Sequence, residues 1–309
     1  MLNTASVTVS VPATTANIGP GFDCLGAALS LYNQFTFTKL DGEPGTVAIA
    51  ASGQEADRVQ TDANNLAYQA FAHFYQQFEQ PVPAIQIEIQ LGVPLARGLG
   101  SSATAIVGGL LGAQALADFA SDRESVMQQA IALEGHPDNV VPALLGGCRL
   151  AATNSQNSWE ICELSWHENV VPIVAIPNFE LSTAEARRVL PTSYSRADAI
   201  FNTAHLGLLV QGLATGNRAW LQAALHDRIH QPYRQALIPG YEVVHQAAMD
   251  AGAYGLVISG AGSTLLALAD PAQAKQVQTA IASTWQSHDT QADVQVVKLD
   301  RTGASIHIP

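Results

Sequence analysis

The chain has 309 residues, which at roughly 150 residues per domain leaves room for about two domains. Hydrophobic residues make up 48% and charged residues 13%, so the composition excludes disordered, collagen-like and small disulfide-stapled proteins. The 14 basic and 26 acidic residues leave a net charge of −12, which argues against nucleic acid and anionic membrane surfaces as partners.

The compartment expected from the sequence is a reducing cytoplasm. Cys24, Cys148 and Cys162 are odd in number and form no CxxC pair, and a chain of this size needs no disulfide to fold. The first thirty residues contain no Lys or Arg and no uninterrupted apolar run, so no secretory signal is expected.

The first elements in chain order are short strands and one helix. Apolar and polar residues alternate at Val7–Val11, Phe35–Phe37 and Ile85–Leu91, which predicts half-buried strands. Between them, apolar residues at helical spacing predict an amphipathic helix from about Asn64 to Phe78. Because strands and helices mix without strict βαβ alternation, we expect an α+β fold.

An uncharged stretch follows from Gly98 to Ala117 and is rich in Gly, Ala, Ser and Thr. Gly108 and Gly112 form a GxxxG pair, a pattern also found in membrane helices. Small side chains favour close packing, so we expect a helix buried inside the protein and no membrane association.

Two further helices are expected before the middle of the chain. Ser121 followed by Glu124 has the spacing of a capping box, which predicts a helix that continues through Leu133. Another short helix is expected after Pro142.

The second half of the chain is expected to begin at a polar stretch, Ser155 to Ser158, which divides the chain into domains 1–155 and 156–309. In the second of these domains, the spacing of apolar residues predicts both strands and helices. The strands are Val170–Ile176, Leu256–Ser259, Thr264–Leu268 and Val294–Leu299, and the helices begin at Thr183, Ala197, Asn217, Tyr241 and Pro271.

The most informative local feature is a glycine-rich loop between the Ile85–Leu91 strand and the uncharged helix. Glycines let the backbone approach a ligand, and the free N–H groups of a helix N-terminus favour an anion such as phosphate. The loop reads Pro94, Leu95, Ala96, Arg97, Gly98, Leu99, Gly100, Ser101, Ser102, Ala103, Thr104.

Three phosphate-binding mechanisms could explain this loop. A plain glycine turn with a capping serine is a further explanation, without a ligand. A Walker P-loop needs a lysine after the glycines, and none is present. Gly98 to Ala103 matches the GxGxxA of dinucleotide-binding folds, but the residues that follow read as one helix without a second strand. The third mechanism is a loop whose amides wrap a nucleotide triphosphate, with Mg²⁺ neutralising charge. It suits a chain with only three lysines, Lys39, Lys275 and Lys298.

Six sequence blocks carry a family resemblance. They are PATTANIGPGFD at 12–23, the loop at 98–103, EGHPDNV at 134–140, STAEAR at 182–187, HQPYR at 230–234 with Ile238 to Gly240, and SGAGS at 259–263. In this order the blocks resemble those of the GHMP small-molecule kinases, and among these they are most similar to the members that act on L-homoserine. The resemblance extends from about residue 5 to the last expected strand.

The resemblance implies a two-domain GHMP kinase fold, with a ribosomal S5 domain 2-like N-terminal domain and a ferredoxin-like C-terminal domain. It implies phosphorylation of the L-homoserine γ-hydroxyl by ATP with Mg²⁺, giving O-phospho-L-homoserine on the route to threonine. By analogy with relatives, a homodimer is also possible.

The resemblance also implies site residues. ATP would contact the Pro94 to Thr104 loop and Asn65, and Mg²⁺ would be held by Glu134 with Ser102 or Ser101.

Each charged group of the amino acid would have its own partner. Asp23 would hold the ammonium, and Arg187 and Arg234 would grip the carboxylate as bidentate forks, with Arg188 competing with Arg187. The family pattern also places Asn17, His136, Asn139 and Thr183 around the substrate.

The expected catalytic residues are Asn17, Asn139 and Arg187, with the two asparagines orienting the hydroxyl. Some relatives have a catalytic Asp where this chain has Asn139, so we expect direct attack without a dedicated base, although Asp138 is adjacent.

Two other functions remain open: a GHMP kinase for mevalonate, a sugar or shikimate, and a non-catalytic homologue that senses nucleotide and metabolite. Those acceptors have no ammonium for Asp23, and the sensor would not need Glu134 and the loop serines. His226 and His230 have a zinc-like spacing, but no third ligand is evident.

Overall fold

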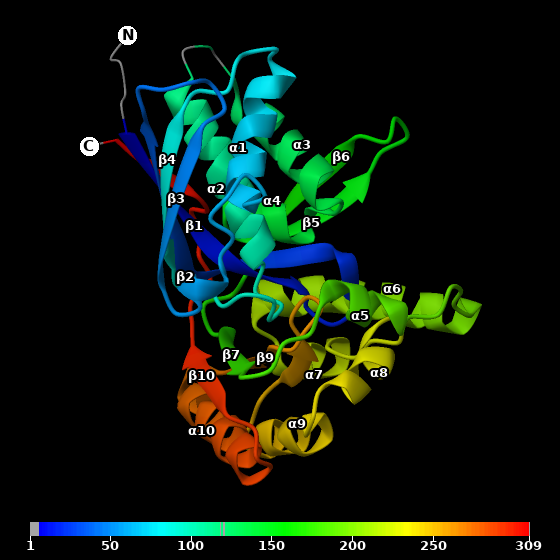
Figure 1. Ribbon diagram of the computed structural model, residues 1–309. Helices are drawn as coiled ribbons and strands as arrows, with labels where there is room; N and C mark the ends of the chain where they lie inside the picture. The colour runs from blue at the N-terminus through cyan, green and yellow to red at the C-terminus, as the bar shows by residue number, and fades with distance from the viewer. Residues whose placement is uncertain (1–5, 118, 120, 309) are drawn as a thin grey trace.

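A computed structural model describes residues 6–117, 119 and 121–308 of the chain. Its upper half is a 7-stranded sheet in which β11, β1, β2, β4 and β3 are neighbours in that order, β5 pairs with β2, and β6 pairs with β5 (Figure 1). The strands are β1 (Ser6–Asn17), β2 (Gly21–Lys39), β3 (Val47–Gly53), β4 (Ile85–Leu91), β5 (Cys148–Thr153), β6 (Trp159–Leu164) and β11 (Ser305–His307).

Within the described residues, four helices cover one face of this sheet: α1 (Leu66–Gln77), α2 (Ser101–Leu116), α3 (Arg123–Glu134) and α4 (Pro137–Leu145). A short 3₁₀ helix, η1 (Ala56–Arg58), follows β3. The apolar residues of β1, β2 and β4 alternate in burial and pack against α1 and α2 as one core, as the period-2 pattern predicts.

The lower half is a 4-stranded antiparallel sheet in the order β10, β7, β9, β8. Its strands are β7 (Val171–Pro177), β8 (Gly255–Ile258), β9 (Leu265–Ala269) and β10 (Ala292–Val296). Its helices are α5 (Thr183–Arg188), α6 (Arg196–Thr215), α7 (Arg218–Ala224), α8 (Gln231–Arg234), α9 (Tyr241–Asp250) and α10 (Pro271–Ser287), with a 3₁₀ turn, η2 (Gln235–Leu237).

Strand β7 is buried on both faces and joins two cores. Ile173 and Ala175 face the core formed with α9 and α10, whereas Val174 faces a second core. That second core also contains Leu25 of β2 and Leu213 of α6. This second core therefore contains residues of both halves of the molecule.

The uncharged helix α2 lies inside the upper half, as predicted. A Cβ added to Gly108 would lie 2.5 Å from the Phe35 ring, and one added to Gly112 would lie 2.4 Å from the Phe37 ring. The GxxxG pair thus allows aromatic rings of β2 to pack on the helix backbone. Among the described residues, no helix is long and apolar enough to cross a membrane.

The expected α+β class is confirmed, and most predicted elements lie within a few residues of their expected positions. Two predictions about helix starts are wrong. Asp122, not Ser121, caps α3 by accepting a hydrogen bond from the Ser125 amide at 2.8 Å. Helix α4 begins at Pro137, where proline suits the first turn, and Pro142 lies inside it.

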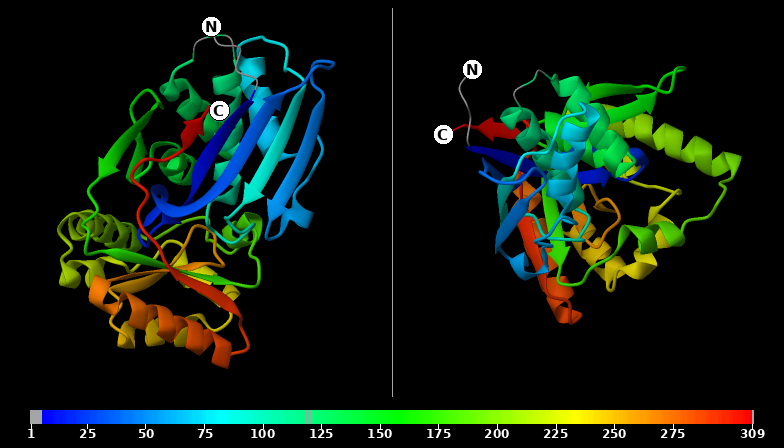
Figure 2. Two further views of the ribbon diagram at one scale, coloured as in Figure 1. Left: turned by 90° about the vertical axis from the view of Figure 1, so that its left-hand side faces the viewer. Right: turned by 45° about the horizontal axis from the view of Figure 1, so that its top comes forward.

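Four strands were not predicted: β3, β5, β6 and β11. The expected domain boundary between residues 155 and 156 lies in the turn that joins β5 to β6, and both strands belong to the larger sheet. The larger sheet also receives β11, which lies beside β1 although it follows every strand of the smaller sheet (Figure 2).

Candidate nucleotide and substrate site

A cavity of about 640 Å³ lies where the two halves meet. It is lined by the turn after β1, the glycine loop before α2, the start of α4, helix α5 and the turn between β8 and β9. Every expected substrate residue lines it: Asn17, Asp23, His136, Asn139, Thr183, Arg187 and Arg234.

Most of the expected ATP-binding residues line the same cavity, namely Asn65, Leu95, Ala96, Arg97, Gly98, Gly100, Ser101 and Ser102. Leu99, Ala103 and Thr104 are fully buried instead, and Pro94 lines a neighbouring cavity. Asn65 caps α1 by accepting hydrogen bonds from the amides of Ala67 and Tyr68, which is the role of an ordinary helix start.

The carbonyl groups of residues 95–99 are all hydrogen-bonded by the protein itself. Their donors, in chain order, are Arg97 Nη1, Leu181 N, Thr264 N, Ser259 Oγ and Thr14 N, at 2.7, 3.4, 3.0, 2.6 and 3.0 Å. These donors come from both halves of the molecule, so the back of the loop is fixed on both sides.

The amides of the loop differ from its carbonyl groups in their hydrogen bonding. Within the described part of the chain, the N–H groups from Ala96 to Ala103 donate to no protein acceptor. Ala96, Gly98 and Gly100 have positive φ values of 53°, 76° and 67°, an alternation that lets successive amides converge on one concavity. Helix α2 begins at its end, so the loop and the helix dipole together form a site for an anion.

The SGAGS block at residues 259–263, between β8 and β9, lies against the back of this loop. A Cβ on Gly98 would lie 2.2 Å from the Ser259 carbonyl oxygen and 2.8 Å from that of Gly262. The Ser259 hydroxyl is also 2.9 Å from Thr15 Oγ1, which ties the block to β1. Only glycine fits where the two segments cross.

Arg97 is held by the protein rather than by solvent. Its Nε donates to Pro177 O at 2.9 Å, and its Nη2 lies 3.0 Å from Glu55 Oε1. Glu55 Oε2 accepts the Leu95 amide at 2.9 Å, and Arg58 connects Glu55 with Glu180. Sequence reasoning missed Glu55, because a lone acidic residue in a polar stretch carries no signal.

Ser102 and Glu134, the two residues expected to hold Mg²⁺, meet at the mouth of the loop. Ser102 Oγ donates to Glu134 Oε1 at 2.7 Å, which brings the start of α2 to the end of α3. Burial raises the pKa of Glu134, and the bond from Ser102 offsets part of that rise. A carboxylate beside a hydroxyl is a donor set that fits Mg²⁺, which prefers oxygen ligands and retains several waters. The described residues contain no cluster of three or more His, Cys, Asp or Glu that could hold a metal.

At the other end of the cavity, Asp23 and Arg187 form a two-pronged ion pair. Arg187 Nη1 and Nη2 donate to Asp23 Oδ2 and Oδ1, each at 3.0 Å. Arg187 lines the cavity and Arg188 does not.

Arg234 is 2% exposed and is fixed from three directions. Its Nε donates to Ala186 O at 3.0 Å, and its Nη1 donates to Gly260 O at 3.1 Å and lies 3.4 Å from His230 Nδ1. In the described structure its Nη2 has no hydrogen-bond partner, so that nitrogen is available to a ligand.

His230 is a buried support for this end of the site. Its Nε2 lies 2.9 Å from Gly19 O, its ring stacks on Phe22, and burial lowers its pKa. A neutral His230 can donate from Nε2 to Gly19 and accept from Arg234 at Nδ1. These contacts give His230 a structural role at this end of the site.

Asn17 and Asn139 are both engaged with neighbouring groups. Asn17 Nδ2 donates to Gly260 O at 2.8 Å, and its Oδ1 accepts the Asp23 amide at 3.0 Å. Asn139 Oδ1 accepts from Thr14 Oγ1 at 2.7 Å. These bonds fix both amides at the cavity wall.

His136 and Asp138 form a second hydrogen-bonded pair at the cavity. His136 Nδ1 lies 2.6 Å from Asp138 Oδ1, and this hydrogen bond raises the pKa of His136. Burial of the Cys24 thiol, together with the charge of Asp138, which is itself 4% exposed, raises the pKa of Cys24 to about 11. Cys24, which sequence reasoning did not place here, is therefore a neutral thiol near the site.

The two-sheet fold and its amide-lined loop define the class of small-molecule kinases known as GHMP kinases. Two family models match the chain: the GHMP kinases N terminal domain at residues 65–147 and the GHMP kinases C terminal domain at residues 209–287. The chain belongs to the GHMP kinase family, and the fold expected from the sequence is confirmed.

Within this family the chain is similar to homoserine kinases. That of Nostoc punctiforme is 64% identical over 300 residues, covering 97% of this chain and 98% of that protein. The crystal structure of homoserine kinase from Cytophaga hutchinsonii is 29% identical, with a TM-score of 0.89 and 98% of each chain covered. Mevalonate kinase of L. major shares the fold at 14% identity and a TM-score of 0.71, covering 95% of this chain and 96% of that one.

Proposed function

We propose that this protein transfers the γ-phosphoryl group of ATP to the side-chain hydroxyl of L-homoserine, giving O-phospho-L-homoserine. The observation that carries the proposal is one cavity with free loop amides at one end and Asp23, Arg187 and Arg234 at the other. The similarity to homoserine kinases over nearly the whole chain supports the same substrate.

The nucleotide end of the proposal rests on the loop from Ala96 to Ala103. Its amides would bind the phosphates, and the base would lie beside Asn65 and Leu66, which line the same cavity. Glu134 and Ser102 would hold Mg²⁺, which supplies positive charge to the phosphates when it is bound. This arrangement needs no lysine.

The acceptor end matches an amino acid that carries both charges. Asp23 would bind the ammonium group, and Arg187 with Nη2 of Arg234 would bind the carboxylate. Asn17 and Asn139, fixed at the cavity wall, would orient the hydroxyl between these groups and the loop. Asp138 is already hydrogen-bonded to His136, which supports direct attack without a dedicated base.

The acceptor panel that tests this proposal contains L-homoserine, mevalonate, galactose and shikimate. We expect ADP release with L-homoserine and Mg²⁺ only, and a loss of about a hundredfold in kcat for Glu134→Gln. Turnover of another acceptor in place of L-homoserine would reject the substrate assignment. Absence of turnover with all four, with ATP still bound, would favour the nucleotide-sensing alternative.

We also infer that the protein acts in a reducing cytoplasm, since Cys24, Cys148 and Cys162 are all free thiols. A homodimer is proposed by analogy with relatives. Sedimentation equilibrium would measure its mass against the 32.5 kDa of one chain.

A further inference from the structure

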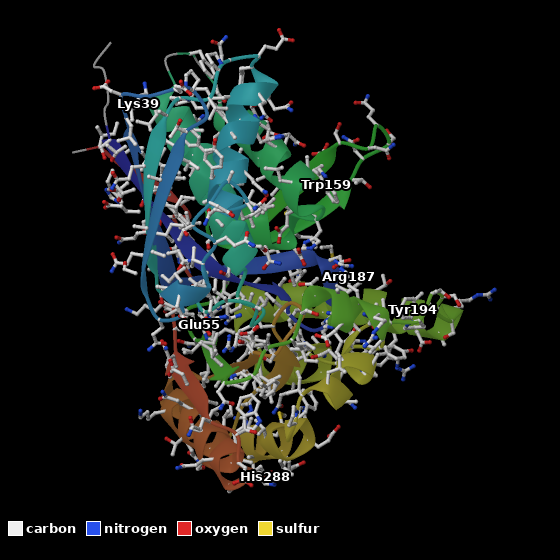
Figure 3. The ribbon with its side chains drawn as sticks, in the orientation of Figure 1. Lys39, Glu55, Trp159, Arg187, Tyr194 and His288 are labelled. Atoms are coloured by element: carbon white, nitrogen blue, oxygen red, sulfur yellow. The ribbon has the colours of Figure 1, made fainter. Side chains whose placement is uncertain are left out.

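The ion pair between Asp23 and Arg187 occupies the place that the substrate's two charges would need. Asp23 lies at the start of β2 in the upper half and Arg187 lies in α5 of the lower half, and both line the cavity. Figure 3 shows Arg187 at the level where the two halves meet. Their side chains are 35% and 41% exposed, so solvent and small molecules reach the pair.

The surroundings of the pair fix its two ends differently. The amide of Asp23 is held by Asn17, and its backbone has a φ of 56°, so the backbone that carries this carboxylate is fixed. The guanidinium of Arg187 lies 5.9 Å from the centre of the Phe22 ring, and Arg234 lies 5.1 Å from the same ring. Two cations and one anion thus face this end of the cavity.

We infer that the Asp23–Arg187 pair selects for zwitterions, because each residue is the other's ligand while the acceptor site is empty. This inference rests on the proposed function. An acceptor with both an ammonium and a carboxylate replaces the pair with two new ion pairs. An acceptor with only one charge that binds to Asp23 or to Arg187 breaks the pair and leaves the other residue without a partner, which weakens the binding of such a substrate.

The inference predicts that each variant binds one singly charged compound more tightly, although it binds L-homoserine more weakly. In Asp23→Asn, Arg187 loses its partner and becomes free to bind a carboxylate. A hydroxy acid that lacks the ammonium, 4-hydroxybutyrate, should therefore bind this variant more tightly than it binds the natural protein. By the same argument, Arg187→Gln frees Asp23 and should favour 3-amino-1-propanol, which lacks the carboxylate.

The experiment measures the inhibition constants of these two compounds against L-homoserine phosphorylation in the natural protein and in both variants. We expect the KM of L-homoserine to rise at least about tenfold in each variant. The inhibition constant of 4-hydroxybutyrate should fall about threefold in Asp23→Asn, and that of 3-amino-1-propanol about threefold in Arg187→Gln.

The matched control is Glu163→Gln, which breaks an ion pair with Arg149 outside the cavity and should change none of these constants. Unchanged or weaker binding of 4-hydroxybutyrate to Asp23→Asn would overturn the inference, because Asp23 would then act only as a ligand of the ammonium. Failure of the natural protein to use L-homoserine would instead reject the proposed function, so the two failures are distinguishable.

Discussion

At Gly98 the backbone has a left-handed φ of 76°, and its Cα lies against the carbonyl groups of Ser259 and Gly262. A side chain there has no space, and moving the loop to make space would disturb the amides on its other face. Both the packing of the loop and the position of its amides therefore require glycine at this residue.

We predict that Gly98→Ala raises the KM for ATP at least about tenfold, since the loop must shift to relieve the contact with Ser259. Steady-state kinetics with varied ATP measure this. Gly45→Ala is the control, because Gly45 also has a positive φ, 83°, but a Cβ there meets nothing within 4 Å. The control should lose only about 1–2 kcal/mol of stability. Equal KM values for the two variants would contradict the prediction.

The His136–Asp138 pair makes stability depend on pH. The bond from Asp138 raises the pKa of His136 above its ordinary 6.5, so the folded protein binds this proton more tightly than the unfolded chain does. The stabilisation is complete below about pH 6.5 and is lost as the pH rises through the higher pKa of the folded state.

Asp138→Asn should therefore lower the pKa of His136. The variant should also be less stable than the natural protein, and the part of this difference that comes from the His136–Asp138 pair should become smaller as the pH rises. NMR titration of His136 and melting curves at several pH values measure both effects. We expect substantial turnover to remain, since Asn139 and Asn17 would still orient the hydroxyl. A fall of about a thousandfold in kcat with intact folding would instead identify Asp138 as a general base.

At the scale of elements, α2 shows how a helix can require glycine. Gly108 and Gly112 accept the rings of Phe35 and Phe37, and Gly109 lies against the Ala67 carbonyl of α1. Glycine weakens an isolated helix, so the stability of α2 comes from packing on both sides.

We predict that Gly112→Ala destabilises the protein by about 1–3 kcal/mol, although alanine is the better helix former. Gly207→Ala in α6 is the matched substitution, because a Cβ there meets nothing within 4 Å. It should stabilise the protein by up to about 1 kcal/mol. Urea unfolding of both variants measures the difference, and equal signs would show that the Phe37 ring moves away at little cost.

Elements with a clear period were predictable from the sequence, as Ile85–Leu91 and α1 show. Strand β11 was not, because its three residues carry no pattern and their pairing with β1 joins positions nearly a full chain apart. The same holds for the site, where residues in sequence motifs were predictable and residues held by distant contacts were not. Motifs located most of the residues that line the cavity, whereas Glu55 depends on a contact between separate loops.

At the scale of the whole molecule, charged side chains connect the two halves behind the nucleotide loop. Arg97 reaches Pro177 of β7 and Glu55 after β3, and Arg58 of η1 pairs with Glu180. Glu55 lies at the junction of the two halves in Figure 3. This network couples the loop to the relative position of the sheets.

Removal of Glu55 should loosen this coupling at the nucleotide end only. We predict that Glu55→Ala raises the KM for ATP about tenfold and changes the KM for L-homoserine by less than about twofold, since the Leu95 amide loses its acceptor and Arg97 loses one of its ion pairs. Asp57→Asn, an acidic residue of η1, is the charge-matched control and should change neither constant. A parallel change of both KM values in Glu55→Ala would contradict the prediction, because Glu55 would then support both ends of the cavity.

The pairing of β11 with β1 constrains the order in which the protein can fold during its synthesis on the ribosome. The larger sheet gains this strand only from residues 305–307, after all residues of the smaller sheet have been translated. Until then, one edge of β1 lacks its partner and is open to pairing with other chains. A nascent chain must therefore protect this edge for nearly the whole of translation.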